Sequence, residues 1–187
     1  MMAGADGTDD AELLARIAGG SEQALADFYR RYQARVYNFA QQRLDNAADA
    51  AEVLNAVMLE VWRGAQAFQG RARVSTWLLG IAHHKSIDLL RKRGRREADH
   101  LDFDIGDDRP DPGPAAVTGA QDSKQVRICL GQLPDAQRQV VYLTFFEDLP
   151  YPEIARILEI PEGTVKTRMF HARKSLAHCL EGLGARL

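Results

Sequence analysis

The sequence of 187 residues has no apolar run close to the ~20 residues that a membrane-spanning helix needs. Its first ten residues, MMAGADGTDD, are acidic and polar and lack the pattern of a secretory signal peptide. Stretches of alternating apolar and polar residues are missing, and so is any internal repeat. These absences argue against a membrane-spanning protein, a β-rich fold and a repeat architecture.

Cysteine is scarce, and its two copies form no CxxC pair. Cys129 and Cys179 each fall on an apolar helical stripe, so we predict buried thiols and a reducing, cytoplasmic setting. The adjacent histidines His83 and His84 point about 100° apart on a helix and cannot easily share a tetrahedral metal ion. We therefore expect no metal, no cofactor and no catalytic residue, with a metal enzyme built on these side chains kept as an alternative.

Charge is unevenly distributed along a chain whose formal net charge is only −2. Residues 63–96 contain nine Lys and Arg against one Asp, whereas residues 97–122 contain eight acids against one Arg. The acidic stretch also holds Pro110, Pro112 and Pro114 and few apolar residues, a composition typical of a flexible linker. The basic stretch sets a local field that attracts phosphates, so it predicts a nucleic-acid partner.

Helical periodicity on both sides of the acidic stretch predicts an all-α fold of two small helical domains joined by a flexible acidic linker. We divide the chain into an N-terminal extension with a short helix (1–20), a first domain (21–96), the linker (97–122) and a second domain (123–187). Ser21 and Ser75 are predicted to cap two helices of the first domain, and Asp49 to open a third. The core of the second domain is predicted to include Val140, Val141, Leu143 and Phe145.

Residues 151–174, YPEIARILEIPEGTVKTRMFHARK, read as a helix, a tight turn and a second, basic helix. Apolar residues of the second helix recur at helical spacing, namely Val165, Met169, Ala172 and Leu176. The other side carries Lys166, Thr167, Phe170, His171 and Lys174, flanked by Arg168 and Arg173. A helix-turn-helix presents its second helix to the DNA major groove in this way, which predicts DNA binding. A merely solvated basic face is the alternative.

Two blocks of sequence occur together in a specific order. STWLLGIAHHKSIDLLRKRGRR ends the first domain, and LPDAQRQVVYLTFFEDLPYPEIARILEIPEGTVKTRMFHARKSL follows the acidic stretch. This arrangement resembles the extracytoplasmic-function (ECF) group of bacterial RNA polymerase sigma factors over residues 22–180. Other helix-turn-helix regulators share the second block but lack the first.

The resemblance implies a division of labour in which the sigma factor itself catalyses nothing. The first domain would bind the clamp of the RNA polymerase core and open the promoter −10 element, and the second would bind the −35 element as duplex DNA. Implied clamp contacts are Asp49, Glu52, Asn55 and Met58. Implied −10 contacts are Arg71, Arg73, Ser75, Trp77, His84, Lys85, Asp88, Arg91 and Lys92. Implied −35 contacts are Lys166, Thr167, Arg168, Phe170, His171, Arg173 and Lys174, the last two holding phosphates.

Several of these positions depart from the usual pattern of the family. Asn55 and Ala56 stand where Gln and Glu are usual, and Met58 replaces an aromatic residue, so we expect clamp binding to be weaker or to be supported elsewhere. His84 replaces an Asn, so the base preference at −10 is open. The family often has Gly in the helix-turn-helix turn where this sequence has Glu159, and we expect a Glu to be tolerated there if its φ stays negative.

The family usually has a dedicated anti-sigma factor, often a membrane protein, that clamps between the two domains. We therefore expect an anti-sigma partner, possible attachment to the inner face of the membrane through it, and no small-molecule substrate. The main alternative is a conventional helix-turn-helix regulator that acts without core polymerase. Such a regulator would need a dimer interface or a ligand domain, and it would leave the basic loop and helix of the first domain unexplained.

Overall fold

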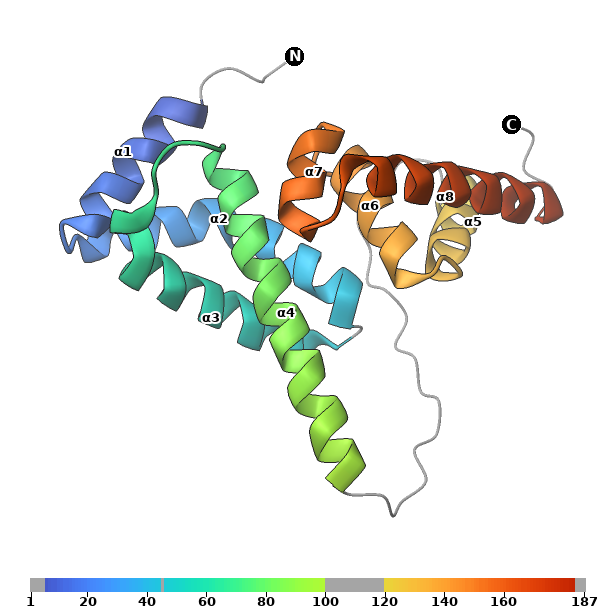
Figure 1. Cartoon of the computed structure of the whole chain (residues 1–187), viewed down its shortest axis with the longest axis horizontal. Helices are drawn as coiled ribbons and strands as arrows, with labels where there is room; N and C mark the ends of the chain where they lie inside the picture. Colours follow the sequence, from blue (N-terminus) through green and yellow to red (C-terminus); the bar gives the residue numbers. More distant parts are fainter. Residues whose placement is uncertain (1–5, 45, 100–119, 184–187) are drawn as a thin grey trace. The chain divides into compact units, whose positions relative to one another are not determined.

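The computed structural model describes residues 6–44, 46–99 and 120–183, and within these ranges all regular secondary structure is helical (Figure 1). The chain divides into two compact units, one before and one after residues 100–119. This confirms the predicted all-α fold with two helical domains. Most of the predicted linker, residues 97–122, lies outside the described residues.

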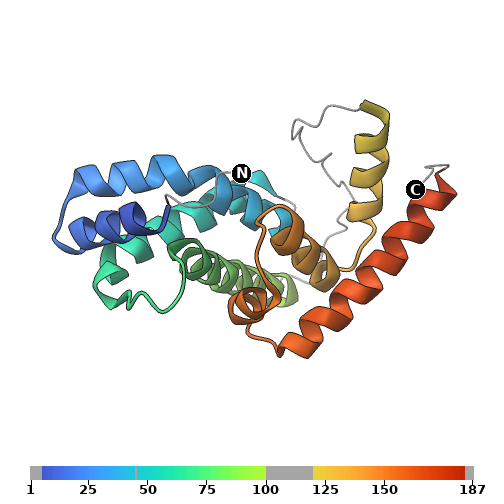
Figure 2. The same ribbon diagram turned by 90° about the horizontal axis from the view of Figure 1, so that it is seen from above.

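The first unit is a bundle in which three long helices pack against one another. Its elements are α1 (Asp6–Ala18), α2 (Glu22–Leu44), α3 (Ala47–Gly64), the short 3₁₀ helix η1 (Ala65–Ala67) and α4 (Val74–Asp99). Helices α2, α3 and α4 contact each other and α1 lies along α2, as Figure 2 shows. Fully buried side chains such as Phe28, Phe39, Val53 and Leu78 fill the space between them.

Helix α1 is fastened to α2 by a buried polar cluster. The carboxylate of Asp10 is buried and accepts hydrogen bonds from the Tyr32 hydroxyl and the Arg31 guanidinium, which also pairs with Asp9. Burial, and then the bond to Asp10, raise the pKa of Tyr32 above its usual value. Each buried polar group of the cluster therefore has a partner, as burial requires.

Helix starts in the first unit agree only partly with the sequence prediction. Ser21 caps α2 as predicted, because its Oγ accepts from the backbone N–H of Ala24 at 3.2 Å. Asp49 does not open α3, since Asn46 is the cap and its Oδ1 accepts from the N–H groups of residues 48 and 49. The predicted cap at Ser75 is also wrong, because α4 already begins at Val74.

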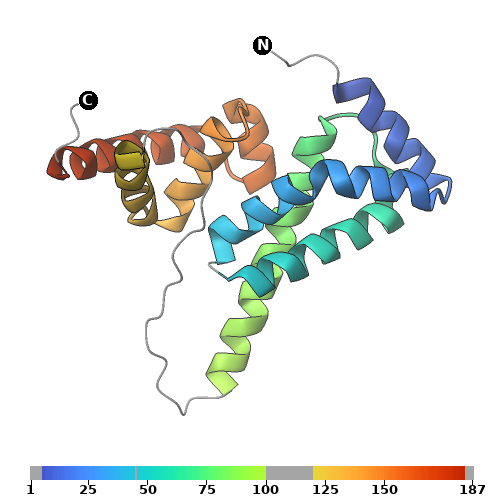
Figure 3. The same ribbon diagram turned by 180° about the vertical axis from the view of Figure 1, so that it is seen from behind.

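The second unit is built around α8, its longest helix. Its elements are α5 (Ala120–Gly131), α6 (Asp135–Phe145), α7 (Tyr151–Leu158) and α8 (Glu162–Gly182). Helix α8 contacts the other three, an arrangement also visible from behind in Figure 3. Val140, Val141 and Leu143 are buried as predicted, but Phe145 is 60% exposed because it is the last residue of α6, beyond the buried segment.

Cys129 and Cys179 form a disulfide that joins α5 to α8, with 5.7 Å between their Cα atoms. The prediction of two buried thiols is therefore wrong, although Cys129 is only 1% exposed. The inference of a reducing compartment loses its basis with the thiols. In the described parts of the chain, no helix combines the length and the apolarity that crossing a membrane requires.

Candidate nucleic-acid interface

Helices α7 and α8 form a helix-turn-helix whose two members share a core. Three residues, 159–161, separate the end of α7 from the start of α8. The carbonyl of Pro161 accepts from the backbone N–H groups of Thr164 (2.9 Å) and Val165 (3.2 Å), which closes the first turn of α8. Ile154 of α7 is buried together with Val165, Met169 and Ala172 of α8, which confirms the predicted apolar stripe at these three positions, whereas its fourth member, Leu176, is half-buried.

The turn between these helices passes through the left-handed region of backbone conformation. Glu159 has φ 52° and ψ 44°, so the condition under which a Glu is easily tolerated there, a negative φ, is not met. The N–H groups of Glu159 and Ile160 both point to the carbonyl of Ala155 and terminate α7. A glycine would adopt this conformation without the steric cost that a Cβ imposes.

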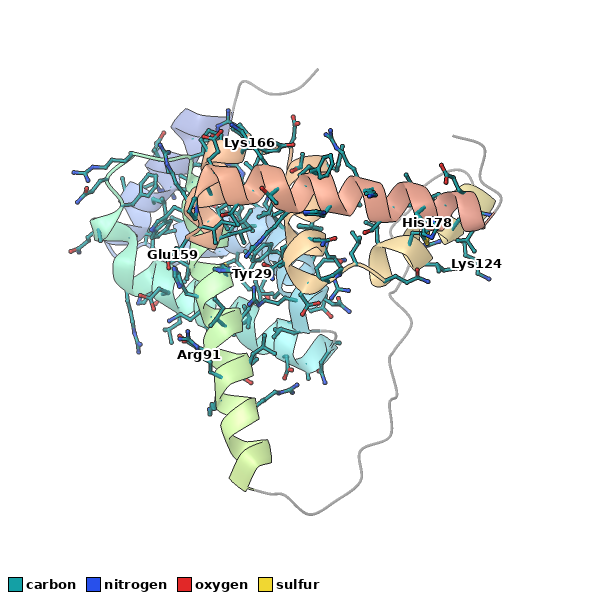
Figure 4. All side chains as sticks on the ribbon, turned by 45° about the vertical axis from the view of Figure 1, so that its right-hand side comes forward. Tyr29, Arg91, Lys124, Glu159, Lys166 and His178 are labelled. Atoms are coloured by element: carbon teal, nitrogen blue, oxygen red, sulfur yellow. A yellow bond between two sulfur atoms is a disulfide. The ribbon has the colours of Figure 1, made fainter. Side chains whose placement is uncertain are left out.

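The residues predicted to read duplex DNA gather on the outer face of α8. Six are exposed, namely Lys166, Thr167, Phe170, His171, Arg173 and Lys174. Arg168 is half-buried at the edge of this face. Phe170 is 66% exposed, which is unusual for a large apolar side chain and suits contact with a partner. Figure 4 labels Lys166 near the beginning of the helix and His178 toward its other end.

Several of these side chains are already engaged with neighbours on α8. Lys166 Nζ lies 2.7 Å from a carboxylate oxygen of Glu162, and this hydrogen bond raises the pKa of Lys166. The Thr167 hydroxyl donates to the carbonyl of Gly163 at 3.0 Å, which leaves its methyl group and its lone pairs for a partner. The Phe170 and His171 rings meet edge to face with centroids 5.5 Å apart. Sequence reasoning missed Glu162, whose spacing of four residues from Lys166 was the available signal.

The predicted −10 residues lie along α4 and the loop before it. Exposed members are Arg71, Arg73, His84, Asp88, Arg91 and Lys92, and half-buried members are Ser75, Trp77 and Lys85. Arg91 is labelled in Figure 4 on α4. The structure thus brings the cations to one helix and one loop, where a strand of nucleic acid can follow them.

Two of these side chains also have contacts inside the first unit, and for Trp77 packing in the core was the alternative to base stacking that the sequence offered. The Trp77 ring lies against Phe68, with centroids 5.3 Å apart, so it is part of a half-buried aromatic pair. Lys85 Nζ donates to Glu60 of α3 at 2.9 Å, and this bond lowers the pKa of Glu60. Lys85 therefore helps to hold α3 against α4 as well as standing near the basic face.

The four predicted clamp contacts on α3 separate into two pairs. Asp49 and Met58 are buried within the unit, and Asp49 forms an ion pair with Arg93 of α4. Burial leaves almost none of either side chain on the surface, so the prediction of direct clamp contacts through them does not agree with the structure. Glu52 and Asn55 are exposed. Leu59, one further turn along the same face, is 47% exposed and was missed by the sequence reasoning.

A shallow groove of about 180 Å³ runs between α3 and α4 beside this face. It is lined by Glu52, Val53, Ala56, Lys85, Asp88, Leu89 and Lys92. In the described residues no cluster of three or more His, Cys, Asp or Glu side chains has the arrangement to hold a metal ion. The surfaces described thus present cations on α4 and α8 and an exposed patch of Glu52, Asn55 and Leu59 on α3.

Comparison with known proteins matches both units. The family models "Sigma-70 region 2" and "Sigma-70, region 4" match residues 28–96 and 123–176. The protein named "ECF RNA polymerase sigma factor SigK" in Mycobacterium tuberculosis is 32% identical over 174 residues, which cover 90% of this chain and 92% of that protein. The Mycobacterium ulcerans protein of the same name is 31% identical over 175 residues, with the same coverage.

Two solved structures share the fold. CnrH in complex with the cytosolic domain of CnrY has a TM-score of 0.65 and 22% identity, and covers 93% of this chain and 98% of that one. The sigma factor RpoE in complex with the anti-sigma factor NepR from Bartonella quintana has a TM-score of 0.69 and 23% identity, and covers 83% and 97%.

Proposed function

The chain belongs to the ECF group of RNA polymerase sigma factors, which direct promoter-specific transcription initiation, and from this premise we propose how its residues divide the work. Within the first unit, residues 21–96 with the continuation of α4 to Asp99 bind core polymerase and open the −10 element. The second unit, residues 123–187 together with the start of α5, binds the −35 element. In this proposal the chain catalyses no reaction.

The −35 element is bound as duplex DNA by the outer face of α8. The observation that carries this assignment is the exposure of basic, polar and aromatic side chains on the side of α8 opposite the buried Val165, Met169 and Ala172. Lys166 and Arg168 are placed to donate to guanine, and the exposed Phe170 to meet a thymine methyl group. Arg173 and Lys174, farther along the helix, hold phosphates and fix its register.

The −10 element is opened by the loop before α4 and the outer face of that helix. Arg71 and Arg73 attract the phosphates of the separated strand, and Arg91 and Lys92 extend the basic surface along α4. An unstacked base needs an aromatic or shaped pocket. The half-buried pair of Phe68 and Trp77 is the aromatic group nearest in sequence to Arg71 and Arg73 that can serve this role.

Core polymerase is bound through the exposed face of α3. Glu52, Asn55 and Leu59 are exposed at helical spacing, which gives one acid, one amide and one apolar anchor on a common surface. Asp49 supports this face indirectly, because its ion pair with Arg93 fixes the start of α3 on α4. An exposed leucine replaces part of the attraction that the missing Glu at position 56 would supply.

An anti-sigma factor is the second protein partner that we propose. The support is that CnrH and RpoE, which share the fold, were solved with CnrY and with the anti-sigma factor NepR. We place the protein in the cytoplasm, where core polymerase works, with the anti-sigma factor able to hold it at the membrane. Co-purification from the native cell, before and after stress, tests this partner, and isolation of the sigma factor alone under every condition would contradict it.

The division of labour is tested by footprinting promoter DNA taken from upstream of the protein's own gene. Three reactions are compared: DNA with the protein, DNA with the protein and core polymerase, and DNA with core polymerase but no protein. We expect protection at −35, and permanganate-reactive thymines at −10, only when protein and core are both present. Clear protection by the protein without core would favour a conventional regulator and overturn the proposal.

A further inference from the structure

An acidic side chain lies within the surface of α8 that we assign to DNA. Glu162 is the first residue of the helix, and its carboxylate lies 2.7 Å from Lys166 Nζ on the next turn. Both side chains remain largely exposed, 43% for Glu162 and 61% for Lys166. A carboxylate there repels phosphates and so weakens sequence-independent binding, because that binding depends on the neutralisation of phosphates by cations.

The pair presents an acceptor and a donor side by side at the end of α8 that enters the major groove in helix-turn-helix proteins. The chain begins α8 at Glu162, so both side chains lie on the first turns. In the major groove, cytosine offers the N4 amino donor and guanine offers the O6 and N7 acceptors. A carboxylate next to an ammonium group therefore matches the two edges of a single G·C pair.

The same arrangement disfavours an A·T pair at that place. With thymine against Glu162, its O4 would meet the carboxylate as a second acceptor, and adenine would offer Lys166 only N7 beside its N6–H₂ donor. In the reverse orientation adenine N6–H₂ can donate to Glu162, but thymine offers Lys166 the single acceptor O4 where guanine offers both O6 and N7. Rejection of the wrong pair by such unpaired groups is a common source of specificity. The exposed ion pair itself adds little to stability, and the helix dipole also favours a carboxylate in the first turn of α8, so the role of Glu162 at the interface is argued from its place beside Lys166.

We propose that Glu162 is a specificity-determining residue of the −35 interface, and this inference rests on the proposed function. Glu162 holds Lys166 in position and accepts from cytosine N4, while Lys166 donates to the guanine of the same base pair. The preferred −35 element accordingly contains one G·C pair that the two side chains read together.

The test selects DNA with the complete holoenzyme, formed from core polymerase and the full-length protein. A library of promoter duplexes randomised across the −35 region is selected by wild type, Glu162→Gln, Lys166→Gln and the matched control Glu181→Gln. The control removes a carboxylate from an exposed position in the last turn of α8, far along the helix from Lys166. Binding of single duplexes from the enriched set is then measured at several salt concentrations.

We expect wild type to require a G·C pair at one position and to discriminate there by roughly 5- to 150-fold. Glu162→Gln and Lys166→Gln should both lose most of that discrimination at the same position, while Glu181→Gln keeps it. Glu162→Gln should also bind unrelated DNA more tightly, since a charge that repels phosphates is gone. An unchanged profile for Glu162→Gln, or relaxation at a position other than that of Lys166→Gln, would overturn this inference alone. Failure of wild-type holoenzyme to enrich any sequence would overturn the proposed function and the inference with it.

Discussion

Breaking the disulfide between Cys129 and Cys179 should destabilise the second unit by about 4 kcal/mol at 25 °C. The two cysteines are 50 residues apart in the sequence, and the loop-closure entropy of a crosslink of that length gives this value. The effect should concentrate in α5. Of the α5 side chains described, residues 124–131, only that of Cys129 is buried, and a further attachment is the bond from Gln125 Nε2 to the carbonyl of Leu183 at 3.0 Å.

The assay compares the oxidised protein with the reduced protein and with the Cys129→Ala/Cys179→Ala variant. Hydrogen exchange read by mass spectrometry should show α5 losing its protection, while α6–α8 keep part of theirs because their shared apolar core is intact. Urea unfolding of the second unit should shift to a lower midpoint. Trp62 and Trp77 both belong to the first unit, so tryptophan fluorescence supplies an internal control that should not change.

Two results would refute this reasoning. Equal protection of α5 in the oxidised and reduced proteins would mean that apolar packing, and not the crosslink, holds α5 on α8. Detection of two free thiols per chain in non-reducing buffer, in the folded protein, would mean that the disulfide does not form. A shift in the tryptophan signal of similar size would show that the two units do not unfold independently.

The remaining predictions concern single sites. Arg168→Ala should cost roughly 1–3 kcal/mol of binding free energy at a cognate −35 duplex in the holoenzyme and spare core binding; loss of core affinity instead would show that α8 is mis-assigned. Replacing Arg91 and Lys92 by Ala should lower promoter opening and reduce the salt slope of binding by about one to two, and an unchanged slope would mean that neither side chain contacts a phosphate. Glu159→Gly should stabilise the second unit by about 1 kcal/mol in urea unfolding, because φ is positive there; destabilisation would contradict this. Because the pKa of Tyr32 is raised in the folded state, its contribution to the stability of the first unit is fully present below about pH 10, the usual tyrosine value, and is lost as the pH rises toward the folded-state pKa. Tyr32→Phe should therefore flatten the loss of stability above about pH 10, measured by unfolding followed through tryptophan fluorescence. The same pH profile in the variant and the wild type would contradict this.

The features that the sequence predicted well are those set by local periodicity. Val165, Met169 and Ala172 are buried because helical spacing alone places them on one face, and their partners on α7 follow from the short turn. The opposite face is exposed for the same reason. The division into two units was predictable from composition, because an acidic stretch with prolines and few apolar residues cannot form a core and separates the two helical regions.

The features that the sequence did not predict depend on partners distant along the chain. Asp49 pairs with Arg93, which lies 44 residues away in the sequence, so the spacing of apolar residues within α3 could not predict that Asp49 is buried. The pairing of Cys129 with Cys179 likewise depends on how α5 docks on α8, since two cysteines at unrelated spacings give no signal. Glu159 is a local failure: its left-handed backbone is imposed by the tight turn and by the hydrogen bond from Ile160 to Ala155.

The most direct test of the central claim is run-off transcription with purified core polymerase on promoter DNA from upstream of the protein's own gene. Four reactions are compared: core alone, core with wild type, core with Arg168→Ala, and wild type without core. The account predicts a strong discrete transcript from core with wild type, a weaker one from core with Arg168→Ala, and none from core alone or from wild type alone. A parallel pull-down should show that wild type and Arg168→Ala both bind core. Core binding without any specific transcript would contradict promoter recognition, and the absence of core binding would contradict the assignment of the protein as a working sigma factor.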